Sequence, residues 1–349
     1  MRPRDEPLLP RASIADVVRG RARVVGSRTR VGRDALGLPP GLISPYEARA
    51  AMGLRYGDPP IEEARHERTR SLAKDASAVA RWLVASLAGA GASRRAEPSD
   101  RAFVVSARVD PIDTHEATDR ILSWLRRREC GQVFFVHPHA LNLASNSAEL
   151  RDDLAAARLV LPDGIGIRIA AAMLGVPFPA NVNGTDLIPE LLLELSAERV
   201  PIALIGGDPG VAARAAEAWS ARTGVRVLGV WDGFRRPEDY EEIRRTIGAS
   251  APCVVLIGMG SPKQERFARQ WFADAPGVVA ITVGGLFDFA SGGKRRAPLA
   301  FRELGLEWLW RLGLEPRRLG KRYLLGNPAF LLRAARQRLT RRDDERTRA

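Results

Sequence analysis

Cysteine is scarce in this chain, whose 349 residues include only Cys130 and Cys253. Two cysteines so far apart supply neither a disulfide framework nor a C-x-x-C metal motif, which is typical of proteins in a reducing, cytoplasmic compartment. Long apolar runs are missing too. No stretch of about 18 apolar residues is available to span a bilayer, and residues 1–20 lack the apolar region of a signal peptide. We therefore expect at most a peripheral contact with a membrane.

Two phosphate-binding motifs are also absent. No G-x-G-x-x-G follows the first predicted strand, and no G-x-x-x-x-G-K-[ST] occurs anywhere in the chain. Both motifs work by presenting glycine backbone and a helix N-terminus to a phosphate at a fixed spacing. Their absence argues against a nicotinamide dehydrogenase and against a P-loop NTPase.

Charge is distributed unevenly along the chain. The formal net charge is +13, of which residues 1–100 carry about +6, residues 101–293 about −3 and residues 294–349 about +10. Residues 1–102 offer too little apolar surface to offset the entropy of ordering, so we predict a basic, largely disordered or loosely helical N-terminal extension. Aromatic residues for base stacking are rare there and the central region is slightly acidic, so nucleic acid is not an expected partner.

Residues 103–293 alternate between strand-like and helix-like segments. The strand-like runs are short and aliphatic, as in "QVFFV" and "PCVVLIG", and most end in Gly, Asp, Pro or His. Apolar strands separated by helices of crossover length predict an α/β domain with a doubly wound, mostly parallel, Rossmann-like sheet. Ligands bind such a sheet beyond the carboxyl ends of its strands. The loops expected there are 137–139, 163–164, 206–208, 232–233, 258–261 and 284–285.

Residues 294–349 interleave arginine with leucine and aromatic residues, and we predict a cationic, amphipathic, helical C-terminal appendage. Its apolar residues include a stripe at helical spacing formed by Leu304, Leu306, Trp308, Leu309, Leu312 and Leu314. With cationic flanks, this composition is typical of a helix at an anionic membrane surface. The alternative is that the stripe packs on the sheet, because Leu and Trp at helical spacing are commonly core residues.

Four strings in this chain occur together in one family. They are "PDGIGI" at 162–167, "NGTDL" at 183–187, "GMGSPKQE" at 258–265, and the block from "GGLFDFASGGKRRAP" through "GLEWLWRLGLEPRR". In this order they resemble the WecG/TagA/CpsF glycosyltransferases, glycosyltransferase family 26, over residues 103–325. The resemblance implies a Rossmann-like fold of the GT-E type, with a C-terminal appendage that helps to close the active site at the membrane.

The resemblance also implies an activity. It is the inverting transfer of a sugar from a UDP-sugar to a polyprenyl-diphosphate-linked glycan acceptor, on the inner face of the cytoplasmic membrane, in cell-surface or exopolysaccharide biosynthesis. A non-catalytic accessory subunit that activates a partner glycosyltransferase is the alternative. The presence of the "PDG", "PKQE" and "KRRAP" strings in one chain favours the enzyme. The donor sugar, the acceptor, the linkage and the formation of a homo-oligomer stay open.

Asp163 is the predicted general base. An Asp-Gly pair after a strand is often only a turn, but inverting transfer needs one carboxylate to take the proton of the acceptor hydroxyl. The resemblance assigns that role to Asp163 and makes the following Gly164 part of the binding site. His137 is the second catalytic candidate, because a histidine can carry charge beside a phosphate near pH 7. His139 and Asn142 complete the expected substrate-binding residues of this region.

The chain departs from the family pattern at two places. His137-Pro138-His139 stands where many relatives carry Thr-x-Asn after the strand, and Asn181 stands where many carry arginine. The first change removes a hydroxyl and an amide that orient a substrate in those relatives. The second bears on which donor is accepted.

Phosphate binding is expected without a metal or any other cofactor. Many sugar-nucleotide enzymes hold a divalent cation with a D-x-D pair, and no such pair stands at a strand end here. Backbone N–H groups at Gly206 and Gly284, helix dipoles and cationic side chains must then neutralise the diphosphate. The cationic candidates are Arg296 first, followed by Arg311, Arg317, Arg318 and Arg322.

The string "GMGSPKQE" suits a nucleotide. It places Gly258 and Gly260 before a helix that starts at Pro262, with Lys263 and Gln264 in the first turn. We expect backbone approach at the glycines and contacts of the Lys and Gln side chains with phosphate or uracil.

The string "NGTDL" offers donors and acceptors for sugar hydroxyls through Asn183, Thr185 and Asp186. Thr185 and Asp186 would equally serve as the N-cap pair of the helix that follows. Both interpretations stay open at the level of the sequence.

Overall fold

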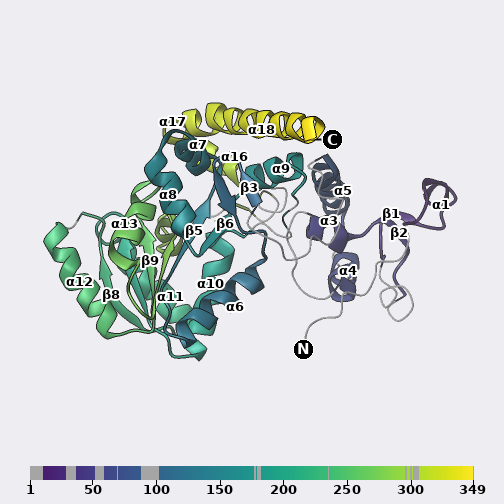
Figure 1. The fold of residues 1–349 in the computed structure, drawn as a ribbon. Helices are drawn as coiled ribbons and strands as arrows, with labels where there is room; N and C mark the ends of the chain where they lie inside the picture. The colour runs from purple at the N-terminus through teal and green to yellow at the C-terminus, as the bar shows by residue number, and fades with distance from the viewer. Residues whose placement is uncertain are drawn as a thin grey trace. The chain divides into compact units, whose positions relative to one another are not determined.

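The computed structural model describes residues 11–28, 37–51, 59–68, 70–87, 102–176, 178, 182–234, 236–294, 297–298, 301 and 306–348 (Figure 1). The chain divides into two compact units. The first contains residues 1–96 and 297–316, and the second contains residues 97–296 and 317–349. The three-segment division that we predict from the sequence, with boundaries after residues 102 and 293, stays a prediction.

The second unit is built on a six-stranded sheet in which every strand pair is parallel. All residues of its five strands other than β8 are buried, as expected when helices cover both faces of a parallel sheet. The spatial order is β6-β5-β10-β9-β7-β8. The strands are β5 (Gly131–Val136), β6 (Leu159–Pro162), β7 (Ile202–Gly206), β8 (Val227–Trp231), β9 (Cys253–Gly258) and β10 (Val278–Thr282).

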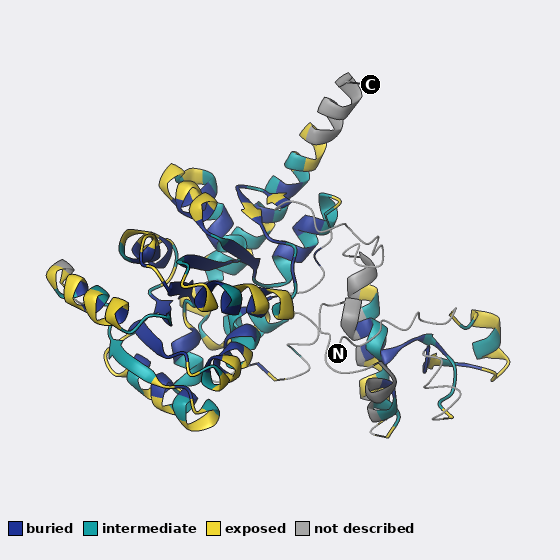
Figure 2. Ribbon diagram, turned by 60° about the horizontal axis from the view of Figure 1, so that its bottom comes forward, coloured by how far each residue is buried: buried dark blue, intermediate teal, exposed yellow. Residues whose placement is uncertain are grey.

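Successive side chains of the strands enter two separate cores. Phe134 and Val136 of β5 belong to one, and Val133 and Phe135 to the other. The first core is covered by α7 (Pro138–Asn146), α8 (Ala148–Ala156), α9 (Ile165–Met173), α12 (Pro237–Ala249), α13 (Lys263–Phe272) and α18 (Gly326–Arg348). The second is covered by α6 (Thr114–Arg126), α10 (Gly184–Ala197), α11 (Val211–Thr223) and α14 (Leu286–Ala290). The predicted doubly wound, Rossmann-like α/β fold is confirmed, and Figure 2 shows its buried strands between helices with exposed outer faces.

The C-terminal part of this unit is helical, as predicted. Helix α17 (Pro316–Gly320) continues through a π-helix, η1 (Lys321–Leu325), into α18, which packs on α7 and α9. Phe330 of α18 is fully buried. Gln337 binds the hairpin of β3 (Ala102–Val104) and β4 (Ala107–Val109): its Nε2 donates to the carbonyl of Phe103 (3.1 Å), and its Oε1 accepts from the N–H of Val105 (2.8 Å). Among the described residues, none of the helices is both long and apolar enough to cross a membrane.

The first unit contains ordered elements where the sequence predicts disorder or loose helix. A short parallel pair, β1 and β2, packs with α3 and α5 around a small apolar core that includes Val25 and Ile43. The core is small because the segment has few apolar residues. The elements are α1 (Ile14–Val18), β1 (Arg23–Val25), β2 (Gly41–Ile43), α3 (Pro45–Ala51), α4 (Pro59–Arg68), α5 (Leu72–Leu87) and α16 (Glu307–Leu314).

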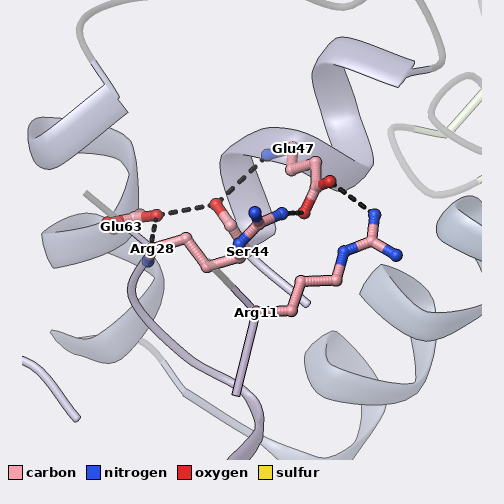
Figure 3. A network of polar contacts seen from close by, with 5 residues as sticks. All are labelled: Arg11, Arg28, Ser44, Glu47 and Glu63. Atoms are coloured by element: carbon pink, nitrogen blue, oxygen red, sulfur yellow. Dashed lines mark hydrogen bonds and ion pairs between the residues drawn. The ribbon is translucent and has the colours of Figure 1, made fainter. Parts of the chain in front are cut away.

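A buried carboxylate supplements that small core (Figure 3). Glu63 of α4 accepts hydrogen bonds from the hydroxyls of Ser27 (2.6 Å) and Ser44 (2.7 Å) and from the N–H of Arg28 (3.0 Å). The Arg28 side chain pairs with Glu47, which also binds Arg11. A buried charge with several hydrogen bonds holds its partners in one arrangement, because any rearrangement would leave the charge unsatisfied. This network therefore joins both strands to α3 and α4.

Candidate active site

The carboxyl ends of the six strands gather at one edge of the sheet, because all strands are parallel. From β9 the chain returns through α13 to β10, whereas from β7 it leaves through α11 to β8 on the other side. The strand order therefore reverses between β7 and β9. In doubly wound sheets this switch point opens a crevice where ligands bind. Gly206 and Gly258 end the two strands and are register partners.

The chain segments that follow β7, β8, β9 and β10 approach each other closely, and glycine makes this approach possible. Gly206 has φ 123°, and a Cβ there would lie 2.4 Å from the carbonyl oxygen of Gly258. A Cβ on Gly258 would lie 2.8 Å from the carbonyl oxygen of Gly284. The N–H of Gly207 donates to the carbonyl of Gly258 (2.8 Å), and the N–H of Gly233 to the carbonyl of Gly207 (3.3 Å). The predicted glycines 206, 258 and 284 are thus brought together.

Gln264 binds these loops and is buried. Its Oε1 accepts from the N–H groups of Gly260 (3.2 Å) and Gly284 (3.0 Å), and its Nε2 donates to Glu265 (2.9 Å). We predicted that Gln264 would contact the substrate and that the Gly284 N–H would face phosphate. In this structure those groups satisfy each other instead. Lys263, the first residue of α13, is exposed beside them.

Asp163 lies at the carboxyl end of β6, next to the end of β5. Its N–H donates to the carbonyl of Val136 (2.8 Å), so the Asp163 loop runs beside the residue that follows Val136, His137. Gly164 has φ 91° and is the N-cap of α9. Asp163 is partly exposed. The turn at Gly164 therefore places Asp163, a partly exposed residue, between the buried strand β6 and helix α9.

His137 connects the start of α7 with the C-terminal helices. Its Nδ1 accepts from the N–H of Ala140 (3.0 Å), and its Nε2 lies 2.9 Å from the Arg322 guanidinium. A neutral ring that accepts at Nδ1 carries its proton on Nε2, so two N–H donors face each other. The ring of His139 stacks near that of His137, with centroids 6.0 Å apart. Burial, and then the charge of Arg322, lower the pKa of His139, which is therefore neutral at pH 7.

Both polar atoms of the Asn142 side-chain amide bind helix α18. Its Nδ2 donates to the carbonyl of Gly326 (2.7 Å), and its Oδ1 accepts from Arg333 (2.6 Å). We predicted a substrate contact for Asn142. The sequence could not indicate this pairing, since Arg333 is 191 residues away.

The residues of the "NGTD" string form hydrogen bonds with one another. Asn183 is the N-cap of α10, and its Oδ1 accepts from the N–H of Asp186 (2.9 Å) and the hydroxyl of Thr185 (2.6 Å). Its Nδ2 donates to the Asp186 carboxylate (2.8 Å). Of the two interpretations of this string, the structure has the helix cap, with Asn183 rather than Thr185 as the capping residue. Thr185 and Asp186 remain partly exposed.

The predicted arginines fall in different places. Arg296 and the departure at Asn181 lie outside the described residues. Arg311 belongs to the first unit, where it binds Glu307 (2.8 Å). Arg317 and Arg318 are exposed on α17. Arg322 lies against another predicted site residue, His137.

The sequence motifs alone do not indicate two further residues near these loops, Phe234 and Arg168. Phe234 follows Gly233 and is 72% exposed, with its N–H bound to Asp232 Oδ1 (3.1 Å). An aromatic residue directly after an Asp-Gly strand exit was the available signal. Arg168 is buried in α9, and burial lowers its pKa to about 10, which leaves it charged at pH 7. It sits between apolar residues in the sequence, and nothing in their spacing marks it.

A doubly wound sheet with glycine loops at its switch point is the architecture of nucleotide-binding α/β proteins. Residues 103–344 match the sequence model of the Glycosyl transferase WecG/TagA/CpsF family. This match spans more than half of the chain, including all six strands of the sheet. The chain therefore belongs to this family of glycosyltransferases, as its motifs predict. Within the described ranges, no group of three or more His, Cys, Asp or Glu side chains lies close enough to hold a metal ion.

Proposed function

We propose that this chain transfers a sugar, with inversion, from a UDP-sugar to a polyprenyl-diphosphate-linked glycan acceptor in cell-surface or exopolysaccharide biosynthesis. Membership of the family supports a glycosyltransferase in general. The observation that carries the finer proposal is the position of Asp163, a partly exposed carboxylate at a strand exit beside the His137–Arg322 pair. A base and a cationic group then lie at the same edge of the sheet.

Asp163 acts as the general base. The acceptor hydroxyl loses its proton as its oxygen attacks the anomeric carbon, and the bond from that carbon to the UDP oxygen breaks. The carboxylate takes the proton, and UDP leaves with the bonding electrons. One carboxylate is enough because UDP is already a good leaving group. The turn at Gly164 keeps Asp163 at the surface of the sheet edge, where an acceptor can reach it.

Phosphate is held by cationic groups and backbone rather than by a metal. His137 Nε2 and the guanidinium of Arg322 lie 2.9 Å apart, and an anion beside them that accepts from both groups would stabilise the pair. Arg322 lies on the C-terminal helices, so this contact couples the appendage to the site. The diphosphate of either substrate has the chemistry that this pair recognises.

The donor nucleotide occupies the crevice between β7 and β9. Glycine at 206 and 258 lets the backbone segments that border this crevice approach each other closely. The exposed ring of Phe234 next to this crevice offers a face for stacking a uracil. Asp163 follows β6, which is separated from β9 by β10 and β5, and there an acceptor would meet the donor sugar.

The C-terminal helices bring the enzyme to the inner face of the cytoplasmic membrane as a peripheral protein. Leu325, Leu332 and Leu339 recur every seven residues, so they share one face of the helix, and they are 65%, 54% and 60% exposed. Exposed cations accompany them at Lys321, Arg336 and Arg338. Exposed leucines with cationic neighbours suit an anionic lipid surface.

The test is release of UDP by the purified full chain from a panel of UDP-sugars, with a detergent-dispersed polyprenyl-diphosphate-sugar as acceptor. The reaction is run with and without EDTA, and with Asp163→Asn beside the parent. We expect turnover that survives EDTA and falls at least about a hundredfold in Asp163→Asn, the range for a lost general base. Absence of both turnover and UDP-sugar binding would contradict the proposal and favour an accessory subunit that activates a partner glycosyltransferase.

A further inference from the structure

One side chain joins two loops at the crevice. Gln264, the second residue of α13, is only 4% exposed, and its Oε1 accepts from the N–H of Gly260 in the loop after β9 and from the N–H of Gly284 in the loop after β10. An amide oxygen has two lone pairs, so these two donors use its whole accepting capacity. The Gln264 oxygen is therefore committed to the backbone of two neighbouring loops.

The other end of Gln264 is held in turn by a buried carboxyl group. Its Nε2 donates to Glu265 Oε1 (2.9 Å), and the same oxygen accepts from the hydroxyl of Ser261 (2.7 Å). Glu265 is 1% exposed, and its Oε2 has no hydrogen-bond partner among the described residues. Burial raises the pKa of this carboxyl group, despite the hydrogen bonds it accepts. Gln264 and Glu265 thus form a buried unit, the Gln264–Glu265 clamp, that begins and ends on the two loops.

The loops that the clamp joins have little freedom to separate or approach. Gly258 and Gly284 are in backbone contact, since a Cβ on Gly258 would lie 2.8 Å from the Gly284 oxygen. Gly260 and Gly284 have positive φ values of 74° and 54°, which let their N–H groups turn toward Gln264. Both hydrogen bonds are part-buried, and their loss would free the two loops from their shared acceptor, so the clamp and the loop shape stabilise each other.

We propose that Gln264 and Glu265 are positioning residues that hold the loops after β9 and β10 at one separation, so that a nucleotide diphosphate meets a preformed crevice. Neither side chain contacts the nucleotide in this scheme. The proposal rests on the proposed function only in assigning the nucleotide to this crevice. It differs from the expectation, drawn from sequence, that Gln264 binds phosphate or uracil directly.

The experiment compares Gln264→Ala with Gln270→Ala, an exposed glutamine on the same helix. Hydrogen exchange is measured on the full chain for the amides of Gly260 and Gly284, and the dissociation constant of UDP is measured alongside. We expect both amides to exchange at least about tenfold faster in Gln264→Ala, and UDP to bind about tenfold more weakly, because both backbone N–H groups lose the acceptor that holds their loops together. Gln270→Ala should leave both quantities at the parent values.

Conservative variants separate positioning from mere folding. Glu265→Gln keeps an acceptor for Ser261 and for Gln264, so it should weaken UDP binding less than Glu265→Leu does. If Gln264→Ala does not fold, Gln264→Glu serves in its place, since it retains an acceptor for both glycines but cannot donate to Glu265. It should then raise the KM for the UDP-sugar more than it lowers kcat.

The outcomes distinguish the two proposals. Weaker UDP binding in Gln264→Ala with unchanged exchange at Gly260 and Gly284 would make Gln264 a ligand and overturn the clamp. Unchanged exchange with unchanged UDP binding would overturn it as well. If the parent chain binds no UDP, the proposed function fails, and faster exchange of both amides in Gln264→Ala still supports the clamp.

Discussion

At the scale of single residues, glycine is needed at the crevice because neighbouring backbone leaves no room for a side chain, and not because the loops must be flexible. Gly206 combines φ 123° with a backbone oxygen 2.4 Å from any Cβ, so both its conformation and its surroundings exclude a side chain. Gly248, on α12, has an ordinary φ and nothing within 4 Å of a Cβ. The two positions therefore form a matched pair for the same substitution.

Gly206→Ala should lower the free energy of unfolding by about 1–3 kcal/mol, because the strained backbone must move away from Gly258. Gly248→Ala should raise it by about 0.5–1 kcal/mol, because alanine is the better helix former. Urea unfolding of both variants measures the difference. Equal effects at the two sites would show that the close approach at the switch point is relaxed in solution.

The buried carboxyl group of Glu265 predicts a dependence of stability on pH. Burial raises its folded-state pKa above the ordinary value of 4.5, so between those two values the folded chain binds more protons than the unfolded chain. The free energy of unfolding then falls as pH rises through this window. Asp153 of α8, whose pKa burial also raises, adds repulsion and acts in the same direction.

Glu265→Gln removes this titration, so its stability relative to the parent should increase as the pH is raised from about 5 to about 8. Denaturant unfolding at several pH values provides the comparison. Glu241→Gln, at an exposed position on α12, is the matched control and should show no such trend. A difference between Glu265→Gln and the parent that is constant over this range would mean that Glu265 is charged in the folded protein.

At the scale of elements, α18 is attached to the second unit by polar contacts as well as by its core residues. Asn142 of α7 binds Gly326 and Arg333, and Gln337 binds the β3–β4 hairpin. Phe330 adds one fully buried ring. Since Arg322, which meets His137, lies just before α18, the attachment of this helix also determines where that guanidinium sits.

Asn142→Ala should loosen α18, because it removes the acceptor of Arg333 and the donor to Gly326, at a cost of about 1–3 kcal/mol. Amide exchange in residues 326–340 should rise, while exchange in β9 and β10 should change little. Asn146→Ala is the control, because Asn146 is an exposed residue of α7, the helix that contains Asn142. If exchange along α18 is the same in both variants, the helix is held by its apolar contacts alone.

At the scale of the whole molecule, positive charge is concentrated at the C-terminus, where several leucines are also exposed. The segment from residue 294 carries about +10 of the formal net charge of +13. The repeat of Leu325, Leu332 and Leu339 places exposed apolar surface among these cations. Such a surface binds anionic lipid through the electrostatic attraction of its cations and through burial of its leucines. Salt weakens only the electrostatic attraction.

Leu332→Asp should weaken binding to vesicles that contain anionic lipid by about tenfold or more, because it puts a charge in place of an exposed apolar side chain that the lipid would cover. Leu193→Asp is a matched control, since Leu193 is also 54% exposed but lies on α10. Vesicle co-sedimentation at low and at high salt measures both. Equal loss in the two variants would show that the C-terminal helices are not the lipid-binding face.

The sequence alone was enough to predict the sheet and its edge. Strands buried on both faces are continuously apolar, and these runs end at Gly, Asp or Pro. The positions of Asp163, Gly206 and Gly258 at strand ends could therefore be predicted from the sequence. The family could also be identified from motif order, and the match over residues 103–344 confirms it.

Only the tertiary structure decided which polar side chains are available to a ligand. Gln264, Asn142 and Asn183 look equally free in the sequence, yet the first is taken up by Gly284, the second by Arg333 and the third by its own helix. A hydrogen-bonding group is satisfied by whatever the fold brings within about 3 Å of it, and for Gln264 and Asn142 those partners lie 20 and 191 residues away. The local sequence gives the chemistry of a side chain but not its hydrogen-bond partner. At this edge of the sheet, that partner determines what the side chain does.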